Sequence, residues 1–138
     1  MRLLRDISGV AAVEAAIVFP VLFFVGFGVL DAALLVQQTH RMEAGLGAAG
    51  SYLAQGEGSA EQRATARHVA VSGETAPGGQ PTIAGWTAQD VRISTRGDAS
   101  APIAELSSSI PYKGLGLMNG LGRGRLRVEA RYEVRLAS

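Results

Sequence analysis

The chain has 138 residues, no cysteine and a formal net charge of +1 at pH 7. The lack of cysteine excludes a disulfide framework and a thiolate metal site. The nearly balanced charge gives no strong electrostatic field, so we expect no nucleic-acid partner. The length leaves room for one small domain beside a membrane segment.

The first nine residues, MRLLRDISG, form a short basic leader with Arg2 and Arg5 against Asp6. The segment after the following apolar run begins with the uncharged Gln37 and Gln38. Because positive charge collects on the cytoplasmic side of a membrane, this asymmetry predicts a cytoplasmic N-terminus. Residues 37–138 would then form an extracytoplasmic, periplasmic domain.

An apolar run follows the leader, and we expect a transmembrane helix over residues 10–36. Residues 15–30 carry no charge and cover about 24 Å as a helix, against a hydrocarbon thickness of about 30 Å. A secretory signal peptide, with its shorter apolar core of about 7 to 15 residues, is the competing interpretation. Cleavage after Leu30 or Ala33 would then release a secreted domain. Asp31 lies at the far edge of the span, where we expect an interfacial residue that reaches the outer headgroups.

Glu14 places a carboxylate inside the apolar run. An ionised side chain at bilayer depth costs about 2.5 to 3.5 kcal/mol on insertion scales, so it usually has a partner. In one interpretation Glu14 lies in the first helical turn near the headgroups, where the helix dipole favours an anion. In the other, cleavage after Gly9 places a new amine on Val10, one turn below Glu14. Pro20 removes a helical hydrogen bond in mid-span, which predicts a bend or a proline tolerated by the membrane.

Gly9, VAAVE ending at Glu14 and AAIVFP ending at Pro20 together resemble the processing and membrane segment of TadE-like pseudopilins of the tight-adherence (Flp-type) type IV pilus system. The resemblance implies a minor pseudopilin cleaved between Gly9 and Val10 by a prepilin peptidase. It also implies that Glu14 sets subunit register by pairing with an amine, its own or a neighbour's, and that Pro20 kinks the helix.

The partners implied by this resemblance are the prepilin peptidase, other pilin or pseudopilin subunits, an inner-membrane assembly platform and membrane lipid. The implied location is the bacterial inner membrane or a surface pilus, with a role in pilus assembly, adhesion or secretion. The alternative class is an unprocessed single-span membrane anchor or structural subunit of an envelope complex.

The helical pattern continues beyond the span and predicts one long helix from Val10 to Ala54, with apolar residues at Leu35, Met42, Leu46, Ala49 and Leu53. The sequence AGLGAAG at residues 44–50 has low helix propensity, so a helix there needs tight packing against the protein's own sheet or a neighbouring subunit. Ser59 is the expected N-cap of a short second helix. Residues 72–85 are rich in glycine and proline and predict an exposed loop.

The last third of the chain predicts an antiparallel sheet of two or three strands packed on the long helix, an α+β fold. Apolar and charged residues alternate over residues 126–136, and shorter alternations cover residues 91–94 and 106–112. We interpret the alternating arginines and glutamates as a solvated face that discourages edge pairing.

Residues 113–125, KGLGLMNGLGRGR, contain no phosphate-binding pattern and precede a strand. We interpret them as a long hairpin connection in which Leu115, Leu117, Met118 and Leu121 are either exposed or folded back. If exposed, this apolar loop is a candidate contact with other subunits or with the membrane surface. His40 and His68 lie on separate predicted helices with no nearby pair of acidic residues at ligand spacing, so no metal site is expected. Ser107, Ser108 and Ser109 are interpreted as strand residues. We therefore expect no catalytic residues, no cofactor and no enzyme.

Overall fold

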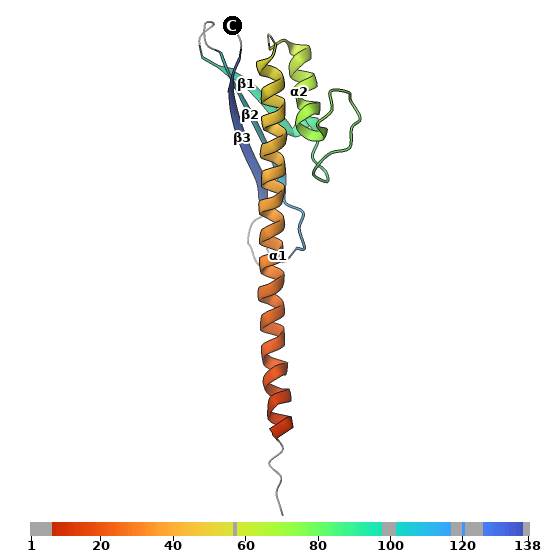
Figure 1. Ribbon diagram of the computed structural model, residues 1–138, viewed down its shortest axis with the longest axis vertical. Coiled ribbons are helices and arrows are strands. Elements are labelled where there is room, and N and C mark those ends of the chain that lie inside the picture. Colours follow the sequence, from red (N-terminus) through yellow and green to blue (C-terminus); the bar gives the residue numbers. More distant parts are fainter. Residues whose placement is uncertain (1–6, 57, 98–101, 117–119, 121–125, 137–138) are drawn as a thin grey trace, which may run out of the picture.

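The computed structural model describes residues 7–56, 58–97, 102–116, 120 and 126–136. They form two helices, α1 (Ile7–Ala54) and α2 (Ala60–Ser72), the short 3-10 helix η1 (Ala88–Asp90), and three strands, β1 (Val91–Arg96), β2 (Ile103–Pro111) and β3 (Arg127–Arg135). The sheet and α2 pack around the C-terminal half of α1, whereas its N-terminal half extends away from the domain (Figure 1). The predicted α+β fold is confirmed.

The long helix α1 is continuous over 48 residues and contains Pro20. It ends at Ala54 as predicted and begins at Ile7 rather than Val10. Four apolar residues of α1 repeat at helical spacing and are at most 1% exposed: Met42, Leu46, Ala49 and Leu53. The pattern beyond the apolar run therefore marks the part of α1 that forms the core.

The sheet has the order β1-β2-β3, and both neighbouring pairs are antiparallel. The central strand β2 buries alternate residues against the helices, namely Ala104, Leu106, Ser108 and Ile110. In β3 the predicted alternation holds for Val128, which is fully buried, but Tyr132 is 38% exposed. Tyr132 lies at an edge strand, over the glycines of α1, where no further strand covers it among the described residues.

The small residues of α1 are packed by the chain's own elements. A Cβ on Gly45 would overlap the main-chain carbonyl of Ala70 in α2 and lie 2.9 Å from the ring of Trp86. On the other side, a Cβ on Gly50 would lie 2.7 Å from the ring of Tyr132 in β3. Both the sheet and the second helix thus approach the backbone of α1, which explains glycines in the middle of a helix.

The helix α2 begins as predicted, because the Ser59 side chain accepts a hydrogen bond from the main-chain nitrogen of Gln62 at 3.2 Å. It ends at Gly73, whose φ of 77° favours glycine. The following loop is mostly exposed, as predicted, but Trp86 near its end is 1% exposed. The Trp86 indole donates to Ser108 Oγ at 2.9 Å, which ties the loop to β2.

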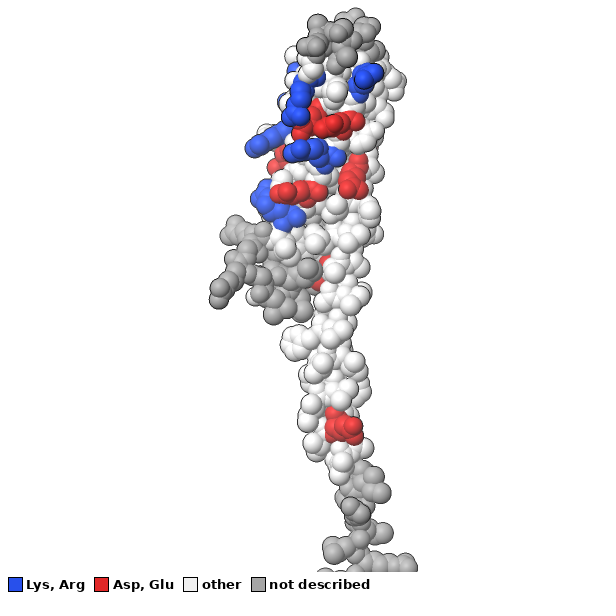
Figure 2. All heavy atoms as spheres, turned by 90° about the vertical axis from the view of Figure 1, so that its left-hand side faces the viewer, with Lys and Arg blue, Asp and Glu red and all other residues white. Residues whose placement is uncertain are grey.

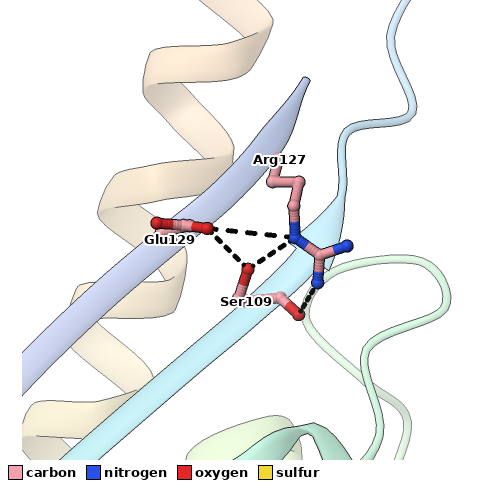
Figure 3. A network of polar contacts seen from close by, with 3 residues as sticks. All are labelled: Ser109, Arg127 and Glu129. Atoms are coloured by element: carbon pink, nitrogen blue, oxygen red, sulfur yellow. Dashed lines mark hydrogen bonds and ion pairs between the residues drawn. The ribbon is translucent and has the colours of Figure 1, made fainter. Parts of the chain in front are cut away.

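The outer face of the sheet carries interleaved arginines and glutamates, which Figure 2 shows over the upper part of the molecule. Glu105 forms ion pairs with Arg96 and Arg131, both at 3.1 Å. At the start of β3, Arg127 donates to Ser109 Oγ at 2.7 Å, and the Ser109 hydroxyl donates to Glu129 at 2.9 Å (Figure 3). These exposed pairs balance charge across the strands, in line with the interpretation of a solvated face.

Candidate membrane and assembly segment

The N-terminal half of α1 exposes a continuous apolar surface. The large apolar side chains of residues 10–30 are 45–68% exposed, including Val10, Ile17, Phe24 and Leu30. A core helix of a soluble protein would be mostly buried, yet none of the most apolar window of α1 is buried. Because an exposed apolar surface of this length marks contact with lipid or protein, this half of α1 could span a membrane.

The predicted processing residues lie in the first turns of α1. Gly9, Val10 and Glu14 line one shallow groove together with Val13 and Ile17. Glu14 is exposed, one helical turn from Val10. Because α1 begins at Ile7, the peptide bond between Gly9 and Val10 is part of the helix. The leader's charged residues, Arg2, Arg5 and Asp6, lie outside the described residues.

The middle of the apolar half offers an exposed apolar groove to another helix. A second groove is lined by Phe19, Leu22, Phe23, Gly26, Phe27 and Leu30. A Cβ on Gly26 or Gly28 would meet no atom within 4 Å, so their small size leaves open space rather than accommodating this chain's own domain. The bend expected at Pro20 stays a prediction, since α1 continues as helix on both sides of it.

Asp31 was expected to reach the headgroups, and this expectation is wrong because its side chain is fully buried. The Tyr112 hydroxyl lies 2.6 Å from the carboxylate Oδ1 of Asp31, and the main-chain nitrogen of Leu115 donates to the same oxygen at 2.9 Å. The segment after β2 therefore covers the carboxylate and satisfies it with hydrogen bonds.

The covering segment is held closely against α1. A Cβ on Gly114 would overlap both the Asp31 carboxylate and the Tyr112 hydroxyl, so only glycine fits between them. Two turns further along α1, the Gln38 side chain donates to the main-chain oxygen of Lys113 at 3.2 Å. Leu115 is 55% exposed, which agrees with the exposed alternative predicted for the apolar residues of 113–125. Leu117, Met118 and Leu121 lie outside the described residues.

Burial and the hydrogen bond to Asp31 raise the pKa of Tyr112 from 10.0 to about 12. The folded protein therefore holds this proton more tightly than the unfolded chain, and the resulting stability is present below pH 10 and lost between about pH 10 and 12. We expect the stability advantage of the wild type over Tyr112→Phe to shrink by about 1 kcal/mol between pH 8 and 11. Denaturant unfolding of both proteins at the two pH values measures this difference, and an advantage independent of pH would contradict it.

The other residues considered for chemistry occupy structural positions. His40 lies 3.3 Å from Glu43 on the exposed surface of α1, whereas His68 lies on α2. Within the described ranges, no group of three or more histidine, aspartate or glutamate side chains could hold a metal ion. Ser107, Ser108 and Ser109 lie in β2, as predicted.

The fold and the exposed helix define an α+β chain with one N-terminal helix able to span a membrane. The model of the TadE-like protein family matches residues 9–50 of the chain. This match begins at Gly9, covers the apolar half of α1 and ends at Gly50, where α1 packs against β3. The resemblance seen in the sequence is thereby confirmed over this segment. No curated protein and no solved structure matches the chain.

Proposed function

We propose that the chain is a minor pseudopilin-like subunit of a tight-adherence (Flp-type) pilus system, cleaved after Gly9 by a prepilin peptidase. The observation that carries this proposal is that the TadE-like match and the exposed apolar half of α1 begin at the same place. The match also continues into the packed half of α1. The same helix would therefore span the membrane with its N-terminal half and form the core of the domain with its C-terminal half.

In this proposal, the N-terminal half of α1 is the assembly element. Cleavage leaves the amine of Val10 one turn below Glu14, and the exposed carboxylate pairs with that amine or with the amine of a neighbouring subunit. Such a pair is strong only where water is excluded, as in a bundle of helices within lipid. The open groove at Gly26 gives a neighbouring helix a place to approach closely.

The proposed location is the bacterial inner membrane, with the N-terminus in the cytoplasm and the domain in the periplasm. The proposed partners are the prepilin peptidase, pilin or pseudopilin subunits, the assembly platform and lipid. The role is structural, in assembly, adhesion or secretion, without catalysis. The bonds of Asp31 argue against signal-peptidase cleavage after Ala33, because that cleavage would remove Asp31 from the domain.

The second candidate is an unprocessed single-span anchor or envelope-complex subunit. One observation favours it: α1 already begins at Ile7, so residues before Gly9 continue the helix. The two candidates differ in whether Gly9 matters for maturation.

Gly9→Ala is expected to block maturation when the chain is produced together with an active prepilin peptidase. Gly26→Ala is the matched control, because a Cβ at either glycine of the same helix meets no atom within 4 Å. Electrophoresis and mass measurement should show loss of the first nine residues for the wild type and for Gly26→Ala, but not for Gly9→Ala. Full-length wild type, or normal processing of Gly9→Ala, would favour the unprocessed anchor instead.

A further inference from the structure

Two hydrogen bonds fix the position of residues 113–115, which follow β2, along the axis of α1. Gln38 binds the main-chain oxygen of Lys113 at 3.2 Å, and Asp31 binds the main-chain nitrogen of Leu115 at 2.9 Å. Gln38 and Asp31 are two turns apart on α1, which is about 10 Å along the helix axis. From Lys113 to Leu115 the chain therefore descends along α1 toward its exposed apolar half.

Asp31 directly follows the charge-free residues 15–30. If residues 11–30, about 30 Å of helix, fill the hydrocarbon core, the groups in contact with Asp31 lie at the boundary between hydrocarbon and headgroups. Each headgroup layer is about 5 to 8 Å thick. The two residue steps from Lys113 to Leu115 cover at most about 7 Å, so this descent stays within one layer. Leu115 then lies at the depth of the outermost acyl carbons.

The exposure of Leu115 is consistent with a position at the membrane surface. Leu115 is 55% exposed, the same fraction as Leu30 at the end of the span. The segment also encloses a carboxylate, since Asp31 is fully buried under Tyr112, Gly114 and Leu115. Enclosure removes a charged group from the lipid-facing surface, where it would be costly.

We propose that residues 113–116 form a second membrane contact, which lies in the lipid headgroup layer and places the Leu115 side chain against the acyl chains. This inference rests on the proposed membrane span and not on processing or on a pilus. Lipid is the proposed occupant because Leu115 is exposed beside Asp31, where the exposed apolar part of α1 ends. The contact fixes the domain close to the membrane and limits its tilt about the end of the span.

Depth-dependent fluorescence quenching tests this contact on the full chain. Because the chain has no cysteine, single-cysteine variants can be labelled with a nitrobenzoxadiazole probe: Leu115→Cys, Leu22→Cys within the span, and Ser94→Cys on the exposed outer face of β1. Each labelled protein is placed in phosphatidylethanolamine and phosphatidylglycerol vesicles with nitroxide lipids labelled at acyl carbon 5 or 12.

The probe at position 115 should be quenched several-fold more by the shallow nitroxide than the probe at position 94. The probe at position 22 should respond most strongly to the deep nitroxide. Equal weak quenching at positions 115 and 94, with strong quenching at 22, would overturn the inference and leave the span intact. No quenching at 22 would overturn the span and the inference together. A blue-shifted probe at 115 that neither lipid quenches would mark a protein contact and also overturn the inference.

Discussion

Gly45→Ala is expected to destabilise the domain by about 1 to 3 kcal/mol, although alanine is the better helix former by about 1 kcal/mol. The reason is that the new Cβ overlaps the main-chain carbonyl of Ala70, which belongs to the backbone of α2 and cannot rotate away. The Trp86 ring lies 2.9 Å from the same Cβ, so α1 cannot relieve the overlap by shifting toward Trp86. The two helices would have to separate, at the expense of the core between them.

Gly47→Ala is the matched control in the same helix. Its Cβ would lie 3.6 Å from the Tyr132 ring, an ordinary contact distance. The gain in helix propensity should therefore survive, and the variant should be as stable as the wild type or more stable by up to about 1 kcal/mol. Denaturant unfolding in detergent, followed by the fluorescence of Trp86, measures both variants, because Trp86 is the single tryptophan and is 1% exposed. Equal effects of the two substitutions would contradict the close approach of α2 to α1.

Asp31→Ala is expected to destabilise the domain by about 1 to 3 kcal/mol, since the buried Tyr112 hydroxyl keeps only the main-chain oxygen of Asp31 as acceptor and the part-buried Leu115 N–H loses the carboxylate. The change also leaves a space where the carboxylate was enclosed. Glu43→Ala is the control, because it removes a carboxylate from the same helix at a position where the side chain is 53% exposed.

The control should change the free energy of unfolding by less than about 0.5 kcal/mol. Asp31→Ala should in addition raise the hydrogen exchange rate of the Leu115 amide, because that amide loses its acceptor. A variant as stable as Glu43→Ala, with unchanged exchange at Leu115, would show that the contact between α1 and the segment after β2 contributes little.

Much of the fold follows from short-range patterns. The helical repeat of Met42, Leu46 and Leu53, the N-cap at Ser59 and the alternation of β2 each depend on neighbours in sequence, and the structure confirms them. Glycines in the middle of α1 indicated a close contact, but the sequence left open whether a neighbouring subunit or the chain's own elements supplied it. The structure resolves this in favour of α2 and β3.

Contacts between distant residues could not be predicted in the same way. Asp31 and Tyr112 are 81 residues apart, and the position of Asp31 at the end of an apolar run suggested contact with headgroups. The signal for a different role was the combination of Tyr112 with Gly114 directly after a strand. Trp86 was missed for a similar reason. The glycine- and proline-rich loop directly before it predicts exposure, whereas the Trp86 indole is buried and bonded to Ser108.

The proposed roles of Gly9, Val10 and Glu14 are inferred from a composite sequence motif and not from the surroundings of each residue in the structure. Gly9, Val10 and Glu14 share one groove of α1, and the TadE-like match begins at Gly9. Their proposed chemistry depends on a new amine and on neighbouring helices, neither of which a single chain contains. Spacing on the helix therefore gives the geometry of the pair, and cleavage decides whether it forms.

The most direct test of the central claim is the mass of the mature chain isolated from its native membrane. Intact-protein mass spectrometry and N-terminal sequencing should find a chain that starts at Val10, with a free or modified amine one turn from Glu14. A chain that retains Met1 or Arg2 in cells with an active prepilin peptidase would contradict processing at Gly9. A soluble chain that starts beyond Leu30 would contradict the membrane helix itself.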